Sequence, residues 1–123
     1  MEKAWKIAYV DSDESAQQHL SQSLTQNLFY TLTIKDAMNA FAELIEFKPD
    51  LILLRVDMPD LNGYELCSLL KNHQDLASIP IIMVSETERQ VNEAKSKRAG
   101  AVTHIAKPLD RTKLLTTIWQ YLQ

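Results

Sequence analysis

The chain has 123 residues, of which 46% are hydrophobic and 24% charged, with a net charge of −3. This composition is typical of one globular domain with a sizeable core, and it excludes a disordered chain and argues against nucleic-acid binding. The single cysteine, Cys67, excludes an internal disulfide and suits a reducing compartment. No apolar run approaches the length of a membrane span of about 20 residues, so we expect a soluble cytoplasmic domain.

Short apolar segments alternate with amphipathic ones in the first half of the chain. Residues 5–10 (WKIAYV) and 29–34 (FYTLTI) are typical of strands, and residues 51–54 (LILL) of a fully buried strand. Between them, residues 13–27 and 36–47 carry apolar side chains spaced three or four apart. This spacing predicts two helices.

The same alternation continues in the second half. Residues 63–73, 88–99 and 110–122 are predicted helices, the middle one very polar, and residues 81–84 and 101–106 are predicted strands. The side chains expected to face inward on the first and last of these helices are Leu66, Leu69, Leu70, Leu114, Leu115, Ile118 and Leu122.

A strand followed by a helix therefore occurs five times. Strands that are apolar throughout belong in a parallel sheet covered by helices on both faces. The sequence thus predicts a doubly wound α/β sandwich, forming one domain over residues 1–123. In such sheets a functional site lies at the carboxyl ends of the strands.

Polar residues follow the predicted strands at those carboxyl ends. They are Asp11, Ser12 and Asp13, then Arg55 and Asp57, then Ser85 and Glu86, and last Lys107. Because parallel strands end at one edge of the sheet, we expect these residues to form a charged cluster.

Four segments, in order, resemble motifs of the receiver domain of bacterial two-component response regulators. They are IAYVDSD, LILLRVDMPDLNGYEL, IPIIMVS and AKPLD, and the resemblance covers essentially the whole chain. It implies a flavodoxin-like sheet of five parallel strands in the order 2-1-3-4-5. It also implies a non-enzymatic signalling module.

In that family a strand-end aspartate accepts a phosphoryl group, with Mg²⁺, a lysine and a hydroxyl group binding the phosphate oxygens. By resemblance, Asp11 matches the first of two metal-binding acids, Ser85 the switch hydroxyl and Lys107 the lysine. Pro108 matches a proline that follows a cis peptide in the family.

Three positions depart from the family pattern. Arg55 stands where the phosphoacceptor aspartate is expected, Ser12 replaces the second metal-binding acid, and His104 replaces an aromatic switch residue. Arginine offers no lone pair and cannot be the nucleophile. We therefore predict a pseudo-receiver with no cofactor, no catalytic residue and lost or weak Mg²⁺ binding. Arg55 should be balanced by Asp11, with Asp57 or Glu86 as further partners.

Alternatives stay open at this stage. Arg55 could extend into solvent without a role, and Asp57 could serve as a substitute phosphoacceptor. Lys107 could pair with Asp11 as a purely structural contact, and His104 could be an ordinary core residue. A flavin-binding protein is less consistent with the sequence, because the acidic first loop, DSDES, lacks phosphate-cradling glycines.

The last helix carries two aromatic residues beside its inward stripe, Trp119 and Tyr121. They could form a partner or dimer surface, or Trp119 could pack over the edge of the core. In the receiver family, the usual output surface would be formed here by residues 88–99, 101–106 and 110–122. Expected partners are a histidine kinase, another regulator, an output protein or a second copy of the chain.

Overall fold

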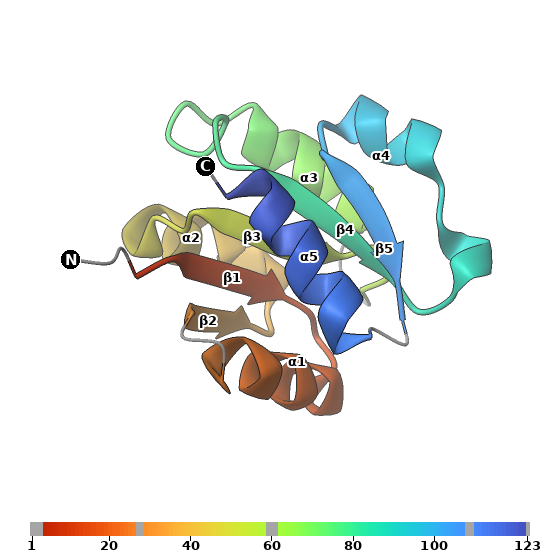
Figure 1. Ribbon diagram of the computed structural model, residues 1–123. Helices are drawn as coiled ribbons and strands as arrows, with labels where there is room; N and C mark the ends of the chain where they lie inside the picture. The colour runs from red at the N-terminus through yellow and green to blue at the C-terminus, as the bar shows by residue number, and fades with distance from the viewer. Residues whose placement is uncertain (1–3, 27–28, 59–61, 108–109, 123) are drawn as a thin grey trace.

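The computed structural model describes residues 4–26, 29–58, 62–107 and 110–122. Their strands form a five-stranded parallel sheet in the order β2-β1-β3-β4-β5 (Figure 1). This confirms the predicted fold and strand order. Among the described helices, none is both long and apolar enough to cross a membrane. The strands are β1 (Lys6–Val10), β2 (Tyr30–Ile34), β3 (Leu51–Arg55), β4 (Ile81–Ser85) and β5 (Thr103–Ala106). The α-helices are α1 (Glu14–Gln26), α2 (Ala40–Phe47), α3 (Gly63–Lys71), α4 (Glu93–Ala99) and α5 (Arg111–Tyr121).

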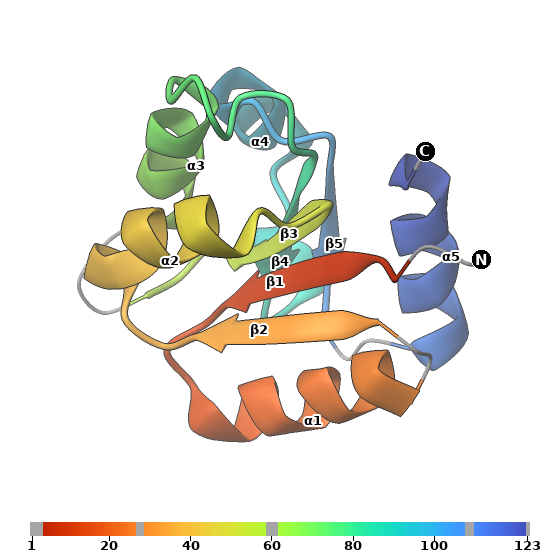
Figure 2. The same cartoon turned by 90° about the vertical axis from the view of Figure 1, so that its left-hand side faces the viewer.

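The two faces of the sheet are covered by different helices. One core packs alternate strand residues such as Ala8, Ile52 and Leu54 against α2, α3 and the end of α4. The other packs Tyr9 and Leu53, among others, against α1 and α5 (Figure 2). Each fully buried Leu or Ile contributes about 1.5–3 kcal/mol relative to an exposed one, so these apolar strands strongly favour the two-sided arrangement.

The strand register brings the polar strand ends to one edge. Val10 pairs with Leu54, so Asp11 begins its loop beside the last residues of β3. Arg55 pairs with Val84, and Ser85 with Ala106. The first residues after β1, β3, β4 and β5 therefore lie close together, as the sequence predicted.

Two predicted helices begin with a 3-10 turn, and one of them is also interrupted. Residues 36–47 divide into a short 3-10 helix, η1 (Ala37–Asn39), and α2. Residues 88–99 divide into η2 (Glu88–Gln90) and α4, with Asn92 capping α4 by accepting the Lys95 N–H. An asparagine cap begins a new helix, which explains why the predicted continuous helix over residues 88–99 is wrong.

The prediction for Leu69 is also wrong, because this side chain is 51% exposed. The buried face of α3 includes Leu66, Cys67 and Leu70, and Leu69 lies about 100° around the helix from Leu70. Burial raises the pKa of Cys67 to about 11, which fits a packing role. Leu114 and Ile118 on α5 and Leu122, which follows it, are buried, and Leu115 is partly buried.

Candidate functional site

Asp11 is the centre of the charged cluster at the carboxyl edge. It follows β1, is fully buried, and receives hydrogen bonds on both oxygens. Oδ1 accepts the Asp13 backbone N–H at 2.9 Å and Arg55 Nη1 at 3.0 Å. Oδ2 accepts the Tyr9 hydroxyl and Lys107 Nζ, the latter at 3.3 Å. An ionised carboxylate has about four lone-pair positions, and here all of them face donors.

These donors set the charge of Asp11. Burial by itself would raise its pKa, but the hydrogen bonds from Tyr9, Asp13 and Arg55 and the charge of Lys107 outweigh it and lower the pKa. Burial, together with the hydrogen bond to Asp11, raises the pKa of Tyr9. Asp11 is therefore a carboxylate and Tyr9 a neutral donor to it.

Arg55, the last residue of β3, points into the cluster. Its side chain is 15% exposed, and besides Asp11 it contacts Glu86 Oε1 through Nη2 at 2.7 Å and Asp13 at 3.8 Å. Burial acts to lower its pKa, but Asp11 and Glu86 raise it, so the guanidinium stays charged. The expected pairing of Arg55 with Asp11 and Glu86 is present, and the side chain does not extend freely into solvent.

Lys107 closes the cluster into a ring of alternating charge. Its backbone N–H donates to the Ser85 carbonyl at 2.8 Å, and its Nζ lies 3.3 Å from both Asp11 and Glu86. We call Asp11, Arg55, Glu86 and Lys107 the ion-pair ring. Each charge in the ring has two partners of opposite sign, so the cluster is internally neutralised.

Gly63 packs against the backbone of Arg55, a member of the ion-pair ring. A side-chain carbon at this position would lie 2.2 Å from the Arg55 carbonyl oxygen, and the Gly63 N–H donates to the Val56 carbonyl at 2.7 Å. Only glycine lets the start of α3 approach the end of β3 this closely, which holds the Arg55 backbone in place.

The other predicted site residues are placed differently. Ser12 is exposed at the turn after β1. Asp57 is exposed beyond the end of β3, and among the described residues it forms no ion pair with Arg55. Ser85 is buried and its hydroxyl hydrogen-bonds Nε2 of His104. Pro108 lies outside the described residues.

The donor set of this cluster does not fit a divalent cation. Mg²⁺ requires several oxygen ligands in octahedral geometry, usually including carboxylates. The oxygens of Asp11 already accept four donors, a guanidinium lies 3.0 Å away, and Ser12 offers no carboxylate. Within the described residues, no three His, Cys, Asp or Glu side chains are grouped to hold a metal ion.

Sequence reasoning missed two members of the site. The hydroxyl of Tyr9 supports Asp11, and a signal existed, because residues two apart on a strand share one face. Ser96 hydrogen-bonds His104 Nδ1 at 2.7 Å. Its inward position, three residues from the buried Ala99, could have been found had the start of α4 been placed correctly.

Trp119 and Tyr121 lie beside Trp5 and Phe29, which precede β1 and β2, and so at the opposite end of the sheet from the ion-pair ring. Trp119 is 46% exposed, and its ring centroid lies 5.3 Å from that of Phe29 and 6.3 Å from that of Trp5. Tyr121 is partly buried against the same core. Trp119 therefore packs over the core edge while half of its surface faces outward.

Comparisons with known proteins agree on the family. The response regulator receiver domain model matches residues 7–119. Protein PilG of Pseudomonas aeruginosa is 27% identical over 92% of this chain and 84% of PilG. The two-component response regulator-like protein APRR5 of Arabidopsis thaliana is 33% identical over 97% of this chain, but the chain spans only 22% of that relative.

Solved structures match over nearly the whole chain. Chemotaxis protein CheY4 of Vibrio cholerae superposes with a TM-score of 0.90 at 25% identity, covering 98% of this chain and 100% of CheY4. The receiver domain of the sensor histidine kinase PA1611 of Pseudomonas aeruginosa shares the fold, with a TM-score of 0.87 at 20% identity over 98% of each chain. The chain belongs to the response regulator receiver domain family of two-component signalling.

Proposed function

We propose that this chain is a pseudo-receiver, which signals by protein–protein contact without accepting a phosphoryl group at position 55. The observation that carries this proposal is the Arg55 guanidinium, held 3.0 Å from Asp11 and 2.7 Å from Glu86. A guanidinium has no lone pair with which to attack phosphorus. Its charge also takes the place that a dication would need, so we expect Mg²⁺ binding to be lost or weak.

The ion-pair ring then has a structural role. Removing one partner of a buried ion pair costs about 3–5 kcal/mol, because the remaining charge is left uncompensated. The ring therefore stabilises one arrangement of the loops after β1, β3, β4 and β5. In this proposal that arrangement is built in, and does not wait for phosphorylation.

The chemistry of the α4–β5–α5 face supports a protein partner there. Apart from Lys107, which the ion-pair ring neutralises, the basic residues between residues 88 and 122 are Arg89, Lys95, Lys97, Arg98, Arg111 and Lys113, and the acidic ones are Glu88, Glu93 and Asp110. This excess of positive charge contrasts with the chain's net charge of −3 and suits an acidic partner surface. A histidine kinase, another regulator, an output protein or the acidic side of a second copy would fit this chemistry.

Intact-mass analysis after incubation with acetyl phosphate and Mg²⁺ tests the proposal. A receiver that has a phosphoacceptor aspartate serves as the positive control. We expect the control to gain a phosphoryl group and this chain to gain none. A stoichiometric adduct on this chain would contradict the proposal.

A second candidate is a working receiver that is phosphorylated at Asp57. The observation in its favour is that Asp57 is exposed two residues after Arg55 and stays outside the ion-pair ring. An adduct that is lost in Asp57→Asn but kept in Asp75→Asn, an exposed aspartate beyond α3, would establish this alternative.

A further inference from the structure

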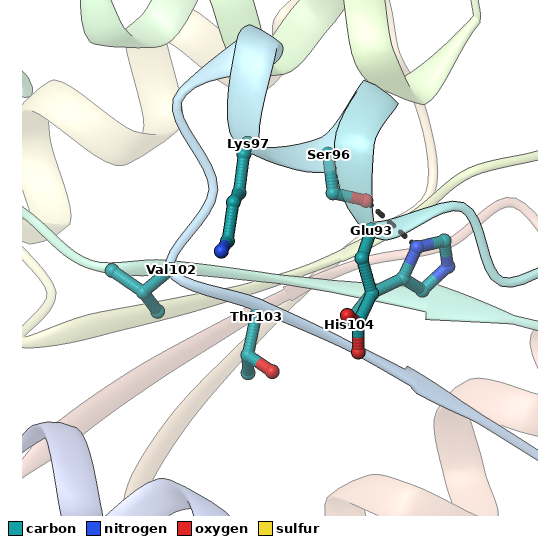
Figure 3. A pocket seen from close by; sticks show the side chains of 6 residues that line it. All are labelled: Glu93, Ser96, Lys97, Val102, Thr103 and His104. Atoms are coloured by element: carbon teal, nitrogen blue, oxygen red, sulfur yellow. Dashed lines mark hydrogen bonds between the residues drawn. The ribbon is translucent and has the colours of Figure 1, made fainter.

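His104 connects the end of β4 to α4 through both ring nitrogens. The residue is on β5, and it is 6% exposed. Its Nε2 hydrogen-bonds the hydroxyl of Ser85 at the end of β4. Its Nδ1 lies 2.7 Å from the hydroxyl of Ser96 on α4 (Figure 3) and 3.3 Å from the backbone nitrogen of Asn92, the residue that caps α4.

These partners determine which nitrogen carries the proton. The Asn92 backbone N–H can only donate, so Nδ1 must be an acceptor. In a neutral ring the proton is then on Nε2, which donates to Ser85. The Ser96 hydroxyl also lies within hydrogen-bond distance of Nδ1. The neutral ring thus ties β4, β5 and α4 into one hydrogen-bonded chain.

We propose that His104 is a proton-operated latch, whose neutral ring holds the start of α4 on the sheet and whose protonation releases it. This inference goes beyond the proposed function and does not rest on it, because the latch acts whether or not Asp57 accepts a phosphoryl group.

The geometry explains how a proton would open the latch. An imidazolium has an N–H on both nitrogens, so its Nδ1–H would face the Asn92 N–H. Two donors would then meet with no acceptor between them. The Ser96 hydroxyl can rotate and become an acceptor, but the backbone of Asn92 can adapt only by moving. Asn92 also caps α4 through its contact with the Lys95 N–H at 2.9 Å, so a displaced Asn92 disturbs the first turn of the helix.

The surroundings give a proton access to the ring. A hollow of about 220 Å³ between α4 and β5 is lined by Glu93, Ser96, Lys97, Val102, Thr103 and His104 (Figure 3). Water in this hollow can reach His104 although the residue is largely buried.

Charged and titratable groups around His104 act in both directions. On α4, Glu93 favours the imidazolium, while Lys97 lines the same hollow with positive charge. On α3, Tyr64 lies 6.2 Å from the His104 ring centroid, with Lys95 over the tyrosine ring at 5.0 Å. Beyond Ser85 on the β4 side, Glu86 is engaged in the ion-pair ring. Burial is the largest influence on the pKa of His104 and lowers it, so the latch is closed at neutral pH.

Amide hydrogen exchange measured by NMR on the whole chain tests the latch. The probes are the Ser96 N–H, bonded to the Asn92 carbonyl, and the Ala101 N–H, bonded to the Ser96 carbonyl. Between about pH 7.5 and about pH 5 we expect their protection to fall about tenfold. The amides of β1 and β3 should keep their protection, and the His104 ring should titrate with the same midpoint as the α4 amides.

Matched variants separate the latch from a general acid effect. His104→Gln can still donate to Ser85 but cannot titrate, so its α4 protection should not depend on pH over this range. His19→Gln, on the exposed surface of α1, should respond as the wild type does. A pH response that persists in His104→Gln would overturn the proposal. If His104→Gln does not fold, the wild type alone still tests the latch. The proposal would also be overturned if the His104 ring and the α4 amides had different pH midpoints, or if the protection of the α4 amides did not change with pH.

Discussion

The ion-pair ring and the His104 junction lie side by side at the carboxyl edge of the sheet, but they are held together by different forces. In the ring, Asp11 and Arg55 have pKa values shifted away from neutrality in opposite directions, so both stay charged. At the junction, a neutral imidazole connects two buried serines. A fixed charged cluster and a titratable side chain can therefore adjoin at the end of one strand, here through Ser85 and Glu86.

The largest expected effect is on the ring. Asp11→Asn removes the buried carboxylate that Arg55 and Lys107 share, and it should lower the free energy of unfolding by about 3–5 kcal/mol. Urea denaturation followed by circular dichroism measures this loss. The matched control is Asp13→Asn, since Asp13 is 49% exposed and 3.8 Å from Arg55, and it should cost under about 1 kcal/mol. Equal losses would show that the ring does not depend on Asp11.

The next effect concerns metal binding. Ser12→Asp combined with Arg55→Asp restores two carboxylates beside Asp11 and removes the cation, so Mg²⁺ should stabilise this double variant. A ligand whose concentration is a hundred times its dissociation constant stabilises the fold by about 2.7 kcal/mol. Arg55→Asp alone should show much less stabilisation, and the wild type none. Full Mg²⁺ stabilisation of the single variant would show that Ser12 is not what limits the site.

The two regions should also lose stability in different pH windows. The pKa of His104 is lowered, so below about pH 6.5 the unfolded chain binds more protons than the folded one, and stability falls as the pH drops toward the folded pKa. The expected loss is about 1.4 kcal/mol for each unit by which the pKa is lowered. The contribution of Asp11, whose pKa is also lowered, is present at higher pH and is lost only as the pH falls below its ordinary value of 3.8.

Urea denaturation at a series of pH values, on the wild type and on His104→Gln, measures these windows separately. The variant should lack the step that begins near pH 6.5 and keep the acid step. A variant that retains both steps would assign the upper one to another group.

The smallest effect is expected at the outer side of the ring. Glu86 is 42% exposed, so Glu86→Gln should lower the free energy of unfolding by only about 1 kcal/mol despite its contacts with Arg55 and Lys107. Because exposed ion pairs are screened by salt, the difference from the wild type should shrink further in about 1 M NaCl. A salt-independent loss as large as that of Asp11→Asn would mean that Glu86 is as critical as Asp11.

Much of the fold and of the charged cluster follows from the sequence alone. Apolar strands separated by amphipathic helices led to the parallel sandwich, because only a sheet covered on both faces buries such strands. The sequence also predicted that one cluster contains Asp11, Arg55, Glu86 and Lys107, because residues that follow parallel strands meet at one edge of the sheet. Because a half-buried guanidinium needs carboxylate partners, their chemical types predicted that Arg55 pairs with Asp11 and with Asp57 or Glu86. The structure shows the pairs with Asp11 and Glu86 and none with Asp57 among the described residues.

Only the tertiary structure decided how side chains meet across elements. Asn92 interrupts the predicted helix and caps the start of α4. In the helix that follows, the Ser96 side chain faces His104. Leu69 faces outward because the packing of Leu66, Cys67 and Leu70 fixed the rotation of α3. Periodicity indicates that a helix has an apolar face, but the start of the helix and its rotation depend on capping and on contacts with distant strands. The hydrogen bonds of His104 depend on both, so they became visible only in the folded chain.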